Sequence, residues 1–263
     1  MSDLSAIRVE IVALEEDRGL LARVVLDRPE ARNALNLTMC VELRRAFEEL
    51  DARDDVRAVL VSGDGPAFCA GADFRERDGR NASWVRSRRL ASFAAYRAIE
   101  LCRKPVVATV HGAVVGSGGE IALSCDFAVA AEQTTFRFPE AHWGTVGATQ
   151  RLQRAIGKRK AKEIIFTNRA VGASEAERLG LVARVVPQAE LHSSGLEIAR
   201  SIAGAPALAM ALTKRSIDLG SEGDLDHGIR VEMTAVEHLL TEASSIETFT
   251  RLVSEARRST DED

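Results

Sequence analysis

The sequence predicts an α/β fold with a helical C-terminal part. Two β-rich runs, "IRVEIVAL" and "LLARVVL", flank "EEDRG", which is the pattern of a β-hairpin. The order strand, helix, strand then occurs around "VRAVLVSG" and returns with "PVVATVHG" and "FAVAAE". After residue 188 only helical patterns follow. Alternation of this kind needs crossover connections, so we expect an α/β core over residues 1–188 and a helical region over residues 189–263.

Each element of the first half has a local signal. "DRPEARNAL" interrupts the sheet because Pro29 cannot donate to a central ladder. "NLTMCVELRRAFEELDAR" has apolar residues at helical spacing and predicts a helix. Residues 74–103 carry many arginines, and only their second half, "WVRSRRLASFAAYRAIELC", has a helical pattern. We therefore expect a mobile loop followed by a helix in that segment.

The second half reads as mostly helical. A capping box with Ser174 as N-cap and Glu177 three residues later, and then Gly180, predicts a short helix before the strand "LVARVV". A terminal helix and three amphipathic helices are expected beyond Pro187, near Leu191–Ala203, Pro206–Leu219 and Leu225–Leu240. These helices are too few for an independent core. We expect them to dock on the core or on a neighbouring subunit.

Composition excludes several classes of function. The formal net charge is −4, so nucleic acid and anionic membranes are poor partners. No apolar stretch approaches the ~20 residues that span a bilayer, and the start "MSDLSAIRVE" lacks the features of a secretion signal. The four cysteines, Cys40, Cys69, Cys102 and Cys125, form no CxxC pair and predict neither a disulfide nor a metal site. We expect a cytoplasmic protein without a metal.

Two glycine-rich turns follow apolar strands, in "FCAGADF" (residues 68–74) and in "AVVGSGGEIALSCD" (residues 113–126). Glycine allows positive φ and lets backbone N–H groups face a ligand without an intervening Cβ. Two such turns could direct two N–H donors at one oxygen, which is an oxyanion hole. Either turn alone is also explained as an ordinary turn at a helix start.

Two glutamates follow these strands. Glu120 lies in the first turn of the helix after the glycines, and Glu140 follows Pro139 at the start of the next helix. The helix dipole favours a carboxylate at both places, which is the structural explanation. Because the carboxyl ends of parallel strands lie on one side of a sheet, both side chains could also line one cleft.

Five stretches together resemble the enoyl-CoA hydratase/isomerase (crotonase) superfamily, over nearly the whole chain: "DRPEARNAL", "FCAGADF", "GAVVGSGGEIALSCDFAVAAEQTTFRFPEAHWG", "TQRLQRAIGKRKAKEIIFT" and "SEAERLGLVARVVP". The resemblance implies a crotonase-like spiral of ββα units and a helical C-terminal region that assembles homotrimers or dimers of trimers. It also implies a coenzyme A thioester as substrate, so that coenzyme A is part of the substrate and no separate cofactor is expected. The carbonyl oxygen would be held by the N–H groups of Ala72 and Ser117.

Within this resemblance, the two glutamates favour hydration. Family hydratases have catalytic carboxylates at the positions of Glu120 and Glu140, and both are present here. Our hypothesis is that Glu120 accepts a proton from water while Glu140 supplies a proton to Cα of a 2-enoyl-CoA, which requires one carboxyl to be protonated. An enoyl-CoA isomerase or a carbon–carbon hydrolase is the alternative. A crotonase-fold assembly subunit without catalysis is a further alternative, against which the intact pair argues.

The resemblance also assigns residues to coenzyme A. These are Ala31, Arg32, Ala70, Ala72, Asp73, Phe74 and Ser117. Candidates for phosphate contact are Arg32, Arg75, Arg257 and Arg258, because guanidinium pairs bidentately with phosphate. Each of these arginines is equally explained as a solvated surface residue.

Two departures from the family pattern concern the site. Ser117 stands where many relatives have glycine, so its backbone must be compatible with a Cβ. The loop "AHWGTVGA" is shorter than in most relatives, and Arg137, His142 and Trp143 lie close to it in sequence. This loop helps to form the acyl pocket in the family. The substitutions point to an aromatic or functionalised acyl group instead of a plain fatty chain.

Two other enzyme classes do not match the glycine-rich turn. A dinucleotide fingerprint needs Gly or Ala at the position of Ile121. The GxSxG elbow of a serine hydrolase centred on Ser117 needs glycine at the position of Val115. Both classes are set aside.

Overall fold

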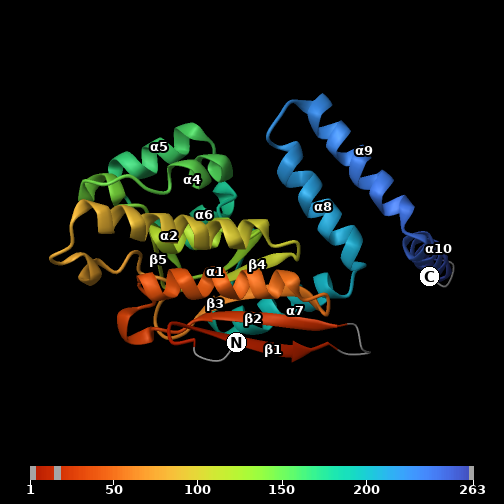
Figure 1. The fold of residues 1–263 in the computed structure, drawn as a ribbon, viewed down its shortest axis with the longest axis horizontal. Helices are drawn as coiled ribbons and strands as arrows, with labels where there is room; N and C mark the ends of the chain where they lie inside the picture. The colour runs from red at the N-terminus through yellow and green to blue at the C-terminus, as the bar shows by residue number, and fades with distance from the viewer. Residues whose placement is uncertain (1–3, 15–18, 261–263) are drawn as a thin grey trace.

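The computed structural model describes residues 4–14 and 19–260, without the side chains of residues 243–244 and 255–260. Its centre is a six-stranded sheet in the order β1-β2-β3-β4-β6-β9 (Figure 1). The strands are β1 (Ile7–Ala13), β2 (Leu20–Leu26), β3 (Val56–Gly63), β4 (Val106–Val110), β6 (Phe127–Ala131) and β9 (Arg184–Val186). β1 and β2 pair antiparallel, which confirms the predicted hairpin. All other neighbouring strands pair parallel.

A smaller sheet of three strands lies beside the candidate site. It contains β5 (Ala113–Val115), β7 (Thr135–Arg137) and β8 (Val171–Gly172) in the order β5-β7-β8. Two isolated bridges, Leu35 with Ala72 and Cys69 with Val114, attach the chain after β3 to this sheet and to the segment before α1. The loop that carries Ala72 is therefore held on both sides by backbone hydrogen bonds.

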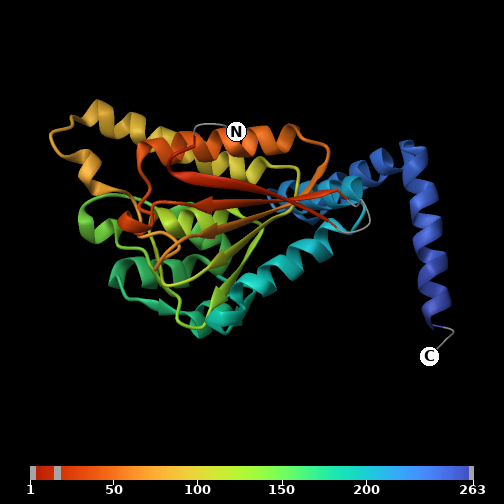
Figure 2. The ribbon, with the colours of Figure 1, turned by 90° about the horizontal axis from the view of Figure 1, so that it is seen from below.

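Helices cover both faces of the large sheet. α1 (Leu37–Ala52) and α2 (Ala82–Leu101) lie on one face, and α7 (Leu191–Ala203) lies on the other (Figure 2). The strand period of two explains this arrangement. In β3, Val59 and Val61 pack in the cluster that includes α1, whereas Ala58 and Leu60 pack in the cluster that includes α7.

Four short helices connect the strands around the site: α3 (Ser117–Ser124), α4 (Thr149–Ile156), α5 (Lys158–Thr167) and α6 (Ala173–Leu179). The predicted capping box at α6 is wrong. Gly172 is the N-cap, without a side-chain cap, and Ser174 already lies inside the helix. Glu177 instead accepts a hydrogen bond from the N–H of Val185. Gly180 ends the helix in the left-handed conformation, as predicted.

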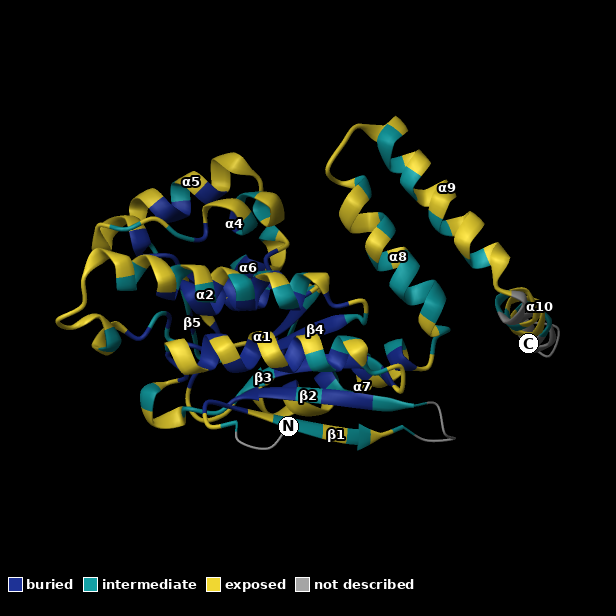
Figure 3. Cartoon of the chain, viewed as in Figure 1, coloured by how far each residue is buried: buried dark blue, intermediate teal, exposed yellow. Residues whose placement is uncertain are grey.

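The last three helices are α8 (Ala207–Gly220), α9 (Leu225–Thr241) and α10 (Ala243–Thr260). α8 and α9 pack against each other and stand apart from the sheet (Figures 1 and 3). α7 is different, because it packs on β3 and β4. The part of the C-terminal region that leaves the core thus begins at about Pro206. Among the described residues, no single helix has the length and apolar composition of a membrane span, although the bent pair of 188–203 and 207–220 meets that test by length and composition alone.

Candidate active site

Ala72 presents a free backbone N–H to a pocket. The N–H of Leu35 donates to the carbonyl of Gly71 at 2.7 Å, and the N–H of Asp73 donates to the carbonyl of Leu35 at 2.9 Å. Because successive N–H groups of an extended chain point to opposite sides, this bridge turns the N–H of Ala72 away from Leu35. In the described part of the chain that N–H has no acceptor. Gly71 allows the turn with φ +102°.

Ser117 provides the second free N–H. The N–H of Gly116 donates to the carbonyl of Arg137 at 2.9 Å, and Gly116 then reverses the chain into α3 with φ +47°. Ser117 is the first residue of α3, where N–H groups have no intrahelical partner. Its own φ is not left-handed, so the Cβ of serine is tolerated. The positive φ that the turn requires falls on Gly116, so a serine can occupy position 117 without backbone strain.

Glu140 lies against these turns and is nearly buried, with 9% of its surface exposed. It opens a short 3-10 helix, Glu140–Trp143, after Pro139. A Cβ added to Gly116 would lie 2.4 Å from its Oε1, and one added to Gly147 would lie 2.7 Å from its Cγ. Two glycines therefore make room for this carboxyl.

The carboxyl of Glu140 has an unusual environment. Its Oε2 is buried without a hydrogen-bond partner among the described residues. Burial raises the pKa of Glu140 above its ordinary value of 4.5, and the nearby charge of Glu120 raises this pKa further, while Arg89 lowers it. The environment of Glu140 therefore shifts its carboxyl toward the protonated form, compared with an exposed glutamate.

Glu120 has the opposite environment. Its Oε1 accepts a hydrogen bond from the N–H of Ala148 at 2.5 Å, and its Oε2 pairs with the guanidinium of Arg151 at 2.6 Å. Arg151 also pairs with Glu100 at 2.6 Å and lies 5.1 Å from the ring centre of Tyr96. Both oxygens of Glu120 thus act as acceptors. α4 holds this carboxylate, and Glu120 does not line the pocket that Glu140 lines.

The pocket has a cavity volume of about 80 Å³. Its wall contains the free N–H groups of Ala72 and Ser117, the side chain of Glu140 and the first turns of α2. The lining residues are Gly71, Ala72, Asp73, Phe74, Arg77, Trp84, Val85, Arg88, Arg89, Val115, Gly116, Ser117, Glu140, Trp143 and Thr145. The rings of Phe74 and Trp143 pack edge to face with their centres 5.0 Å apart, and this contact joins two sides of the pocket wall. The arrangement suits a ligand with one oxygen acceptor and an apolar body.

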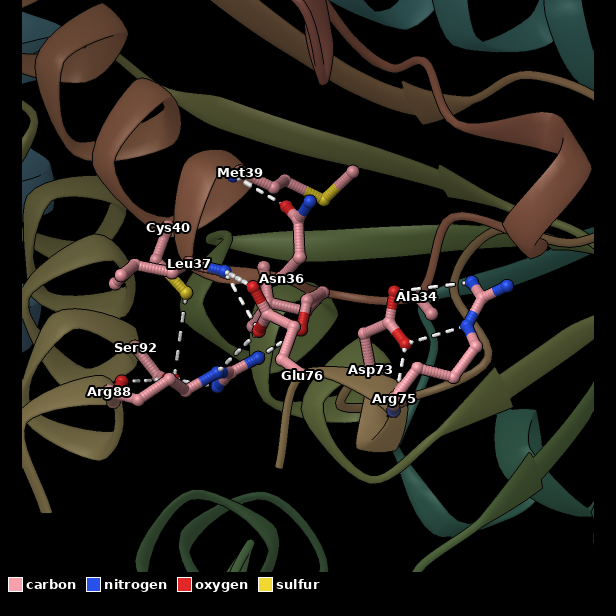
Figure 4. A network of polar contacts seen from close by, with 12 residues as sticks. Ala34, Asn36, Leu37, Met39, Cys40, Asp73, Arg75, Glu76, Arg88 and Ser92 are labelled. Carbon is pink, nitrogen blue, oxygen red and sulfur yellow. Dashed lines mark hydrogen bonds and ion pairs between the residues drawn. The ribbon is translucent and has the colours of Figure 1, made fainter. Parts of the chain in front are cut away.

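A partly buried network fixes the loop between Ala72 and α2 (Figure 4). The carboxylate of Glu76 accepts hydrogen bonds from the N–H of Leu37 at 2.8 and 3.0 Å and pairs with Arg88 at 3.5 Å. Arg88 also donates to the carbonyl of Leu35 and to the hydroxyl of Ser92. The network ties the start of α1, the loop and α2 together.

The residues assigned to coenzyme A divide into two groups. Ala72, Asp73, Phe74 and Ser117 line the pocket, whereas Ala31, Arg32 and Ala70 lie outside its wall. Those three belong to two segments that lie side by side, since the N–H of Ala70 donates to the carbonyl of Arg32 at 3.0 Å. The side chains of Arg257 and Arg258 lie outside the described residues.

Asp73 plays a structural part. Its carboxylate pairs with Arg75 at 3.0 Å and with Arg28 at 3.1 Å. Burial raises the pKa of Asp73, but the hydrogen bonds from Arg75 and Arg28 outweigh burial, so that this pKa lies below its usual value. Arg75 remains exposed at the surface with part of its guanidinium engaged.

Of the three bulky residues near the short loop, only Trp143 lines the pocket. Arg137 donates to Asn168, at 3.1 Å to its carbonyl and 3.0 Å to its side chain. His142 contacts the carbonyl of Phe166 at 2.8 Å through Nε2. Arg137 thus ties the end of β7, and His142 ties the loop, to the C-terminal end of α5, and neither residue lines the pocket.

Sequence reasoning missed two arginines at the site. Arg151 stands in the quoted "TQRL" motif, but its pairing with Glu120 depends on how α4 packs on α3. Arg89 lies in "RSRRL", where only the turn of α2 decides which arginine faces the pocket. Among the residues that the structure describes, no group of His, Cys, Asp and Glu side chains could hold a metal ion.

Comparisons with known proteins agree on one family. The family model for enoyl-CoA hydratase/isomerase matches residues 16–258. The short-chain-enoyl-CoA hydratase of Clostridium acetobutylicum is 38% identical over 224 residues, which are 84% of this chain and 86% of that protein. A probable enoyl-CoA hydratase of Rhizobium meliloti is 37% identical over 86% of this chain and 88% of that protein. The crystal structure of an enoyl-CoA hydratase from Bacillus anthracis matches with a TM-score of 0.90 and 32% identity, over 95% of this chain and 97% of that one.

Proposed function

Since this chain belongs to the enoyl-CoA hydratase/isomerase family, we propose that it adds water across the 2,3 double bond of a 2-enoyl-CoA thioester. The observation that carries the proposal is one pocket that combines two free backbone N–H groups with a buried carboxyl of raised pKa. The hydratases among its relatives support the same reaction.

The two amides would stabilise the negative charge that forms on the thioester oxygen. When a hydroxide equivalent adds to C3, the electrons of the double bond move onto this oxygen as an enolate. Fixed N–H donors such as those of Ala72 and Ser117 stabilise such charge by roughly 3 kcal/mol each. They require no reorganisation, because the bridge at Leu35 and the start of α3 already hold them.

The two glutamates would divide the proton transfers. Glu120, whose oxygens both accept hydrogen bonds, retains free lone pairs and would accept a proton from water. Glu140, whose pKa is raised by burial, would donate its proton to C2. Water is consumed, a C–O and a C–H bond form, and the proton on Glu120 returns to Glu140 through solvent.

Coenzyme A would extend from the pocket past the segment of Ala31, Arg32 and Ala70. Ala72, Asp73, Phe74 and Ser117 would contact the thioester end. Arg32 and Arg75 are both exposed and would approach the phosphates.

Isomerisation of a 3-enoyl-CoA is the second candidate, and one observation favours it. Glu140 lines the pocket while Glu120 is engaged with Arg151 and does not line it. A single carboxyl can remove a proton from C2 and return it to C4, without any added water. This reaction would use the same two amides.

The experiment that separates the two candidates follows the absorbance of the conjugated enoyl thioester. Hydration of crotonyl-CoA removes this absorbance, and we expect its loss with the purified protein. Unchanged crotonyl-CoA together with rising absorbance from a 3-enoyl-CoA would favour isomerisation. No turnover of either substrate, or of a panel of longer acyl groups, would refute both.

The proposal includes assembly as a homotrimer or a dimer of trimers. Its support is the row of exposed apolar side chains on α9, which recur at helical spacing on one face: Leu225, Ile229, Met233, Val236 and Leu240. A row of this length is rarely left to solvent in a protein that is stable alone.

A further inference from the structure

Arg89 is a cation in the wall of the pocket without a carboxylate partner. Its side chain is half-buried, and its guanidinium lies 5.6 Å from the ring centre of Phe93. Within the described ranges, no acidic side chain forms an ion pair with it. Its neighbour Arg88 differs, because Glu76, Ser92 and the carbonyl of Leu35 use its donors.

The surroundings of Arg89 are positively charged. Arg77, Arg80 and Arg86 line an adjoining hollow with it, and Arg80 lies 5.2 Å from the ring centre of Trp84. Between residues 77 and 93 the sequence has a single acidic residue, Asp78. The protein as a whole has a net charge of −4, so this concentration of arginine is local. Such a patch attracts an anion.

The position of Arg89 indicates which end of the substrate meets it. The thioester oxygen would lie at Ala72 and Ser117, and the pocket runs from there to the first turns of α2. Ala31, Arg32 and Ala70, the candidates for coenzyme A, lie outside that wall. The acyl chain therefore extends toward Arg89, between the apolar surfaces of Trp84, Val85 and Trp143.

We propose that the acyl group of the preferred substrate ends in a carboxylate that pairs with Arg89, so that the substrate is the monothioester of an unsaturated dicarboxylic acid. The inference rests on the proposed function and names its substrate class. A guanidinium matches a carboxylate with two parallel hydrogen bonds. A plain alkyl chain would instead remove water from the guanidinium without replacing the lost hydrogen bonds.

Pairing with a carboxylate would also favour the proposed chemistry. Arg89 is the one charge named above that lowers the pKa of Glu140. A negative acyl terminus neutralises Arg89 and so keeps Glu140 protonated for donation to C2. The charge of the acyl terminus would thus influence the pKa of Glu140 through Arg89.

The test compares 5-carboxypent-2-enoyl-CoA with its terminal carboxamide, which has the same shape without the charge. A second pair, 4-carboxybut-2-enoyl-CoA and its carboxamide, covers a shorter chain. We expect kcat/KM for the acid to exceed that for the amide by about tenfold or more at one of these lengths, as for one desolvated ion pair. In Arg89→Gln this ratio should fall to about one.

Arg86→Gln is the matched control, because Arg86 lies on the same helix and does not line the pocket. It should retain the acid-to-amide ratio of the wild type, and Arg89→Lys should retain part of it. Equal rates for acid and amide at both lengths, with crotonyl-CoA still hydrated, would overturn this inference alone. Failure to turn over crotonyl-CoA or any member of the panel would instead refute the proposed function.

Discussion

At the scale of single residues, the two glutamates differ in the groups that surround the carboxyl. Glu140 has an unpartnered buried oxygen, and burial raises its pKa. Glu120 is held by a guanidinium and a backbone N–H. A raised pKa suits Glu140 to the role of the acid. The division proposed from sequence is therefore physically consistent, although the catalytic roles themselves stay a prediction.

Glu140→Gln should abolish hydration and make stability less sensitive to pH. Removing the general acid should cost ~10²–10⁴-fold in kcat, with little change in thioester binding. The folded-state pKa is raised, so the contribution of Glu140 to stability is complete below the unfolded pKa and is lost as pH rises through the folded pKa. The variant should therefore gain stability relative to the wild type as pH rises from below 4.5 through the folded-state pKa of Glu140, which a rise in its Tm relative to the wild type would show.

Glu190→Gln is the control for that comparison, because Glu190 is exposed and does not line the pocket. Its melting temperature should follow that of the wild type at every pH. Full activity of Glu140→Gln with crotonyl-CoA would contradict the two-carboxylate hypothesis. An unchanged difference in Tm across the pH range would contradict the raised pKa.

The pH profile of kcat should reveal the charge of Arg89. If Glu140 acts as the acid, kcat decreases as pH rises through its pKa in the complex. Arg89 lowers that pKa, so Arg89→Gln should move the decreasing limb to higher pH for an uncharged substrate such as crotonyl-CoA. Arg86→Gln should leave the limb in place. A shift to lower pH would show that Arg89 does not act on Glu140 through charge.

The sequence could predict some of these residues and not others. Spacing and resemblance marked Ala72, Ser117, Glu120 and Glu140 because each belongs to a short local pattern. The contact of Arg151 with Glu120 joins residues of two helices that are 31 positions apart in sequence, and no local pattern encodes it. The free N–H of Ala72 likewise depends on its bridge to Leu35, which the loop sequence alone does not show.

At the scale of elements, Gly116 links β5, α3 and the 3-10 helix of Glu140. Gly116→Ala should lower kcat by about 10²-fold, because its φ of +47° is strained for alanine and the new Cβ would lie 2.4 Å from Oε1 of Glu140. Gly157→Ala is the control, since it also has a positive φ, of +80°, but its Cβ would meet no atom within 4 Å.

Both glycine variants should lose about 1–3 kcal/mol of stability from the backbone alone, because neither glycine has a conformation that alanine readily adopts. Only Gly116→Ala should lose activity beyond what unfolding explains, as measured by kcat at a temperature where both proteins are folded. Equal activity of the two variants would show that Gly116 is not needed to make room for Glu140.

Elements with strong patterns were predicted correctly, and those that depend on their neighbours were not. The hairpin β1-β2 and the glycine end of α6 follow from local chemistry. The capping box at Ser174 failed because β8 pairs with β7 up to Gly172, so the helix begins directly at the end of a strand. Strand pairing at Gly172 therefore decided where α6 begins.

At the scale of the whole molecule, the segment 207–260 is the least buried part (Figure 3). None of the described residues of α8 and α9 is fully buried. The apolar row on α9 follows one face at intervals of three and four residues. A helix with an exposed row of this kind needs another surface, and in the assembly proposed above a second copy of the chain would supply it.

The double variant Ile229→Glu/Val236→Glu should therefore separate the subunits. Two buried carboxylates in a subunit interface are costly, since each would be desolvated without a partner. We expect light scattering after size exclusion to give about three or six times the chain mass of 28.5 kDa for the wild type and the mass of one chain for the variant. His238→Glu adds a charge on the opposite face of α9 and should leave assembly unchanged. If the wild type is a monomer at micromolar concentration, or if His238→Glu dissociates it as readily, the row on α9 is not the interface.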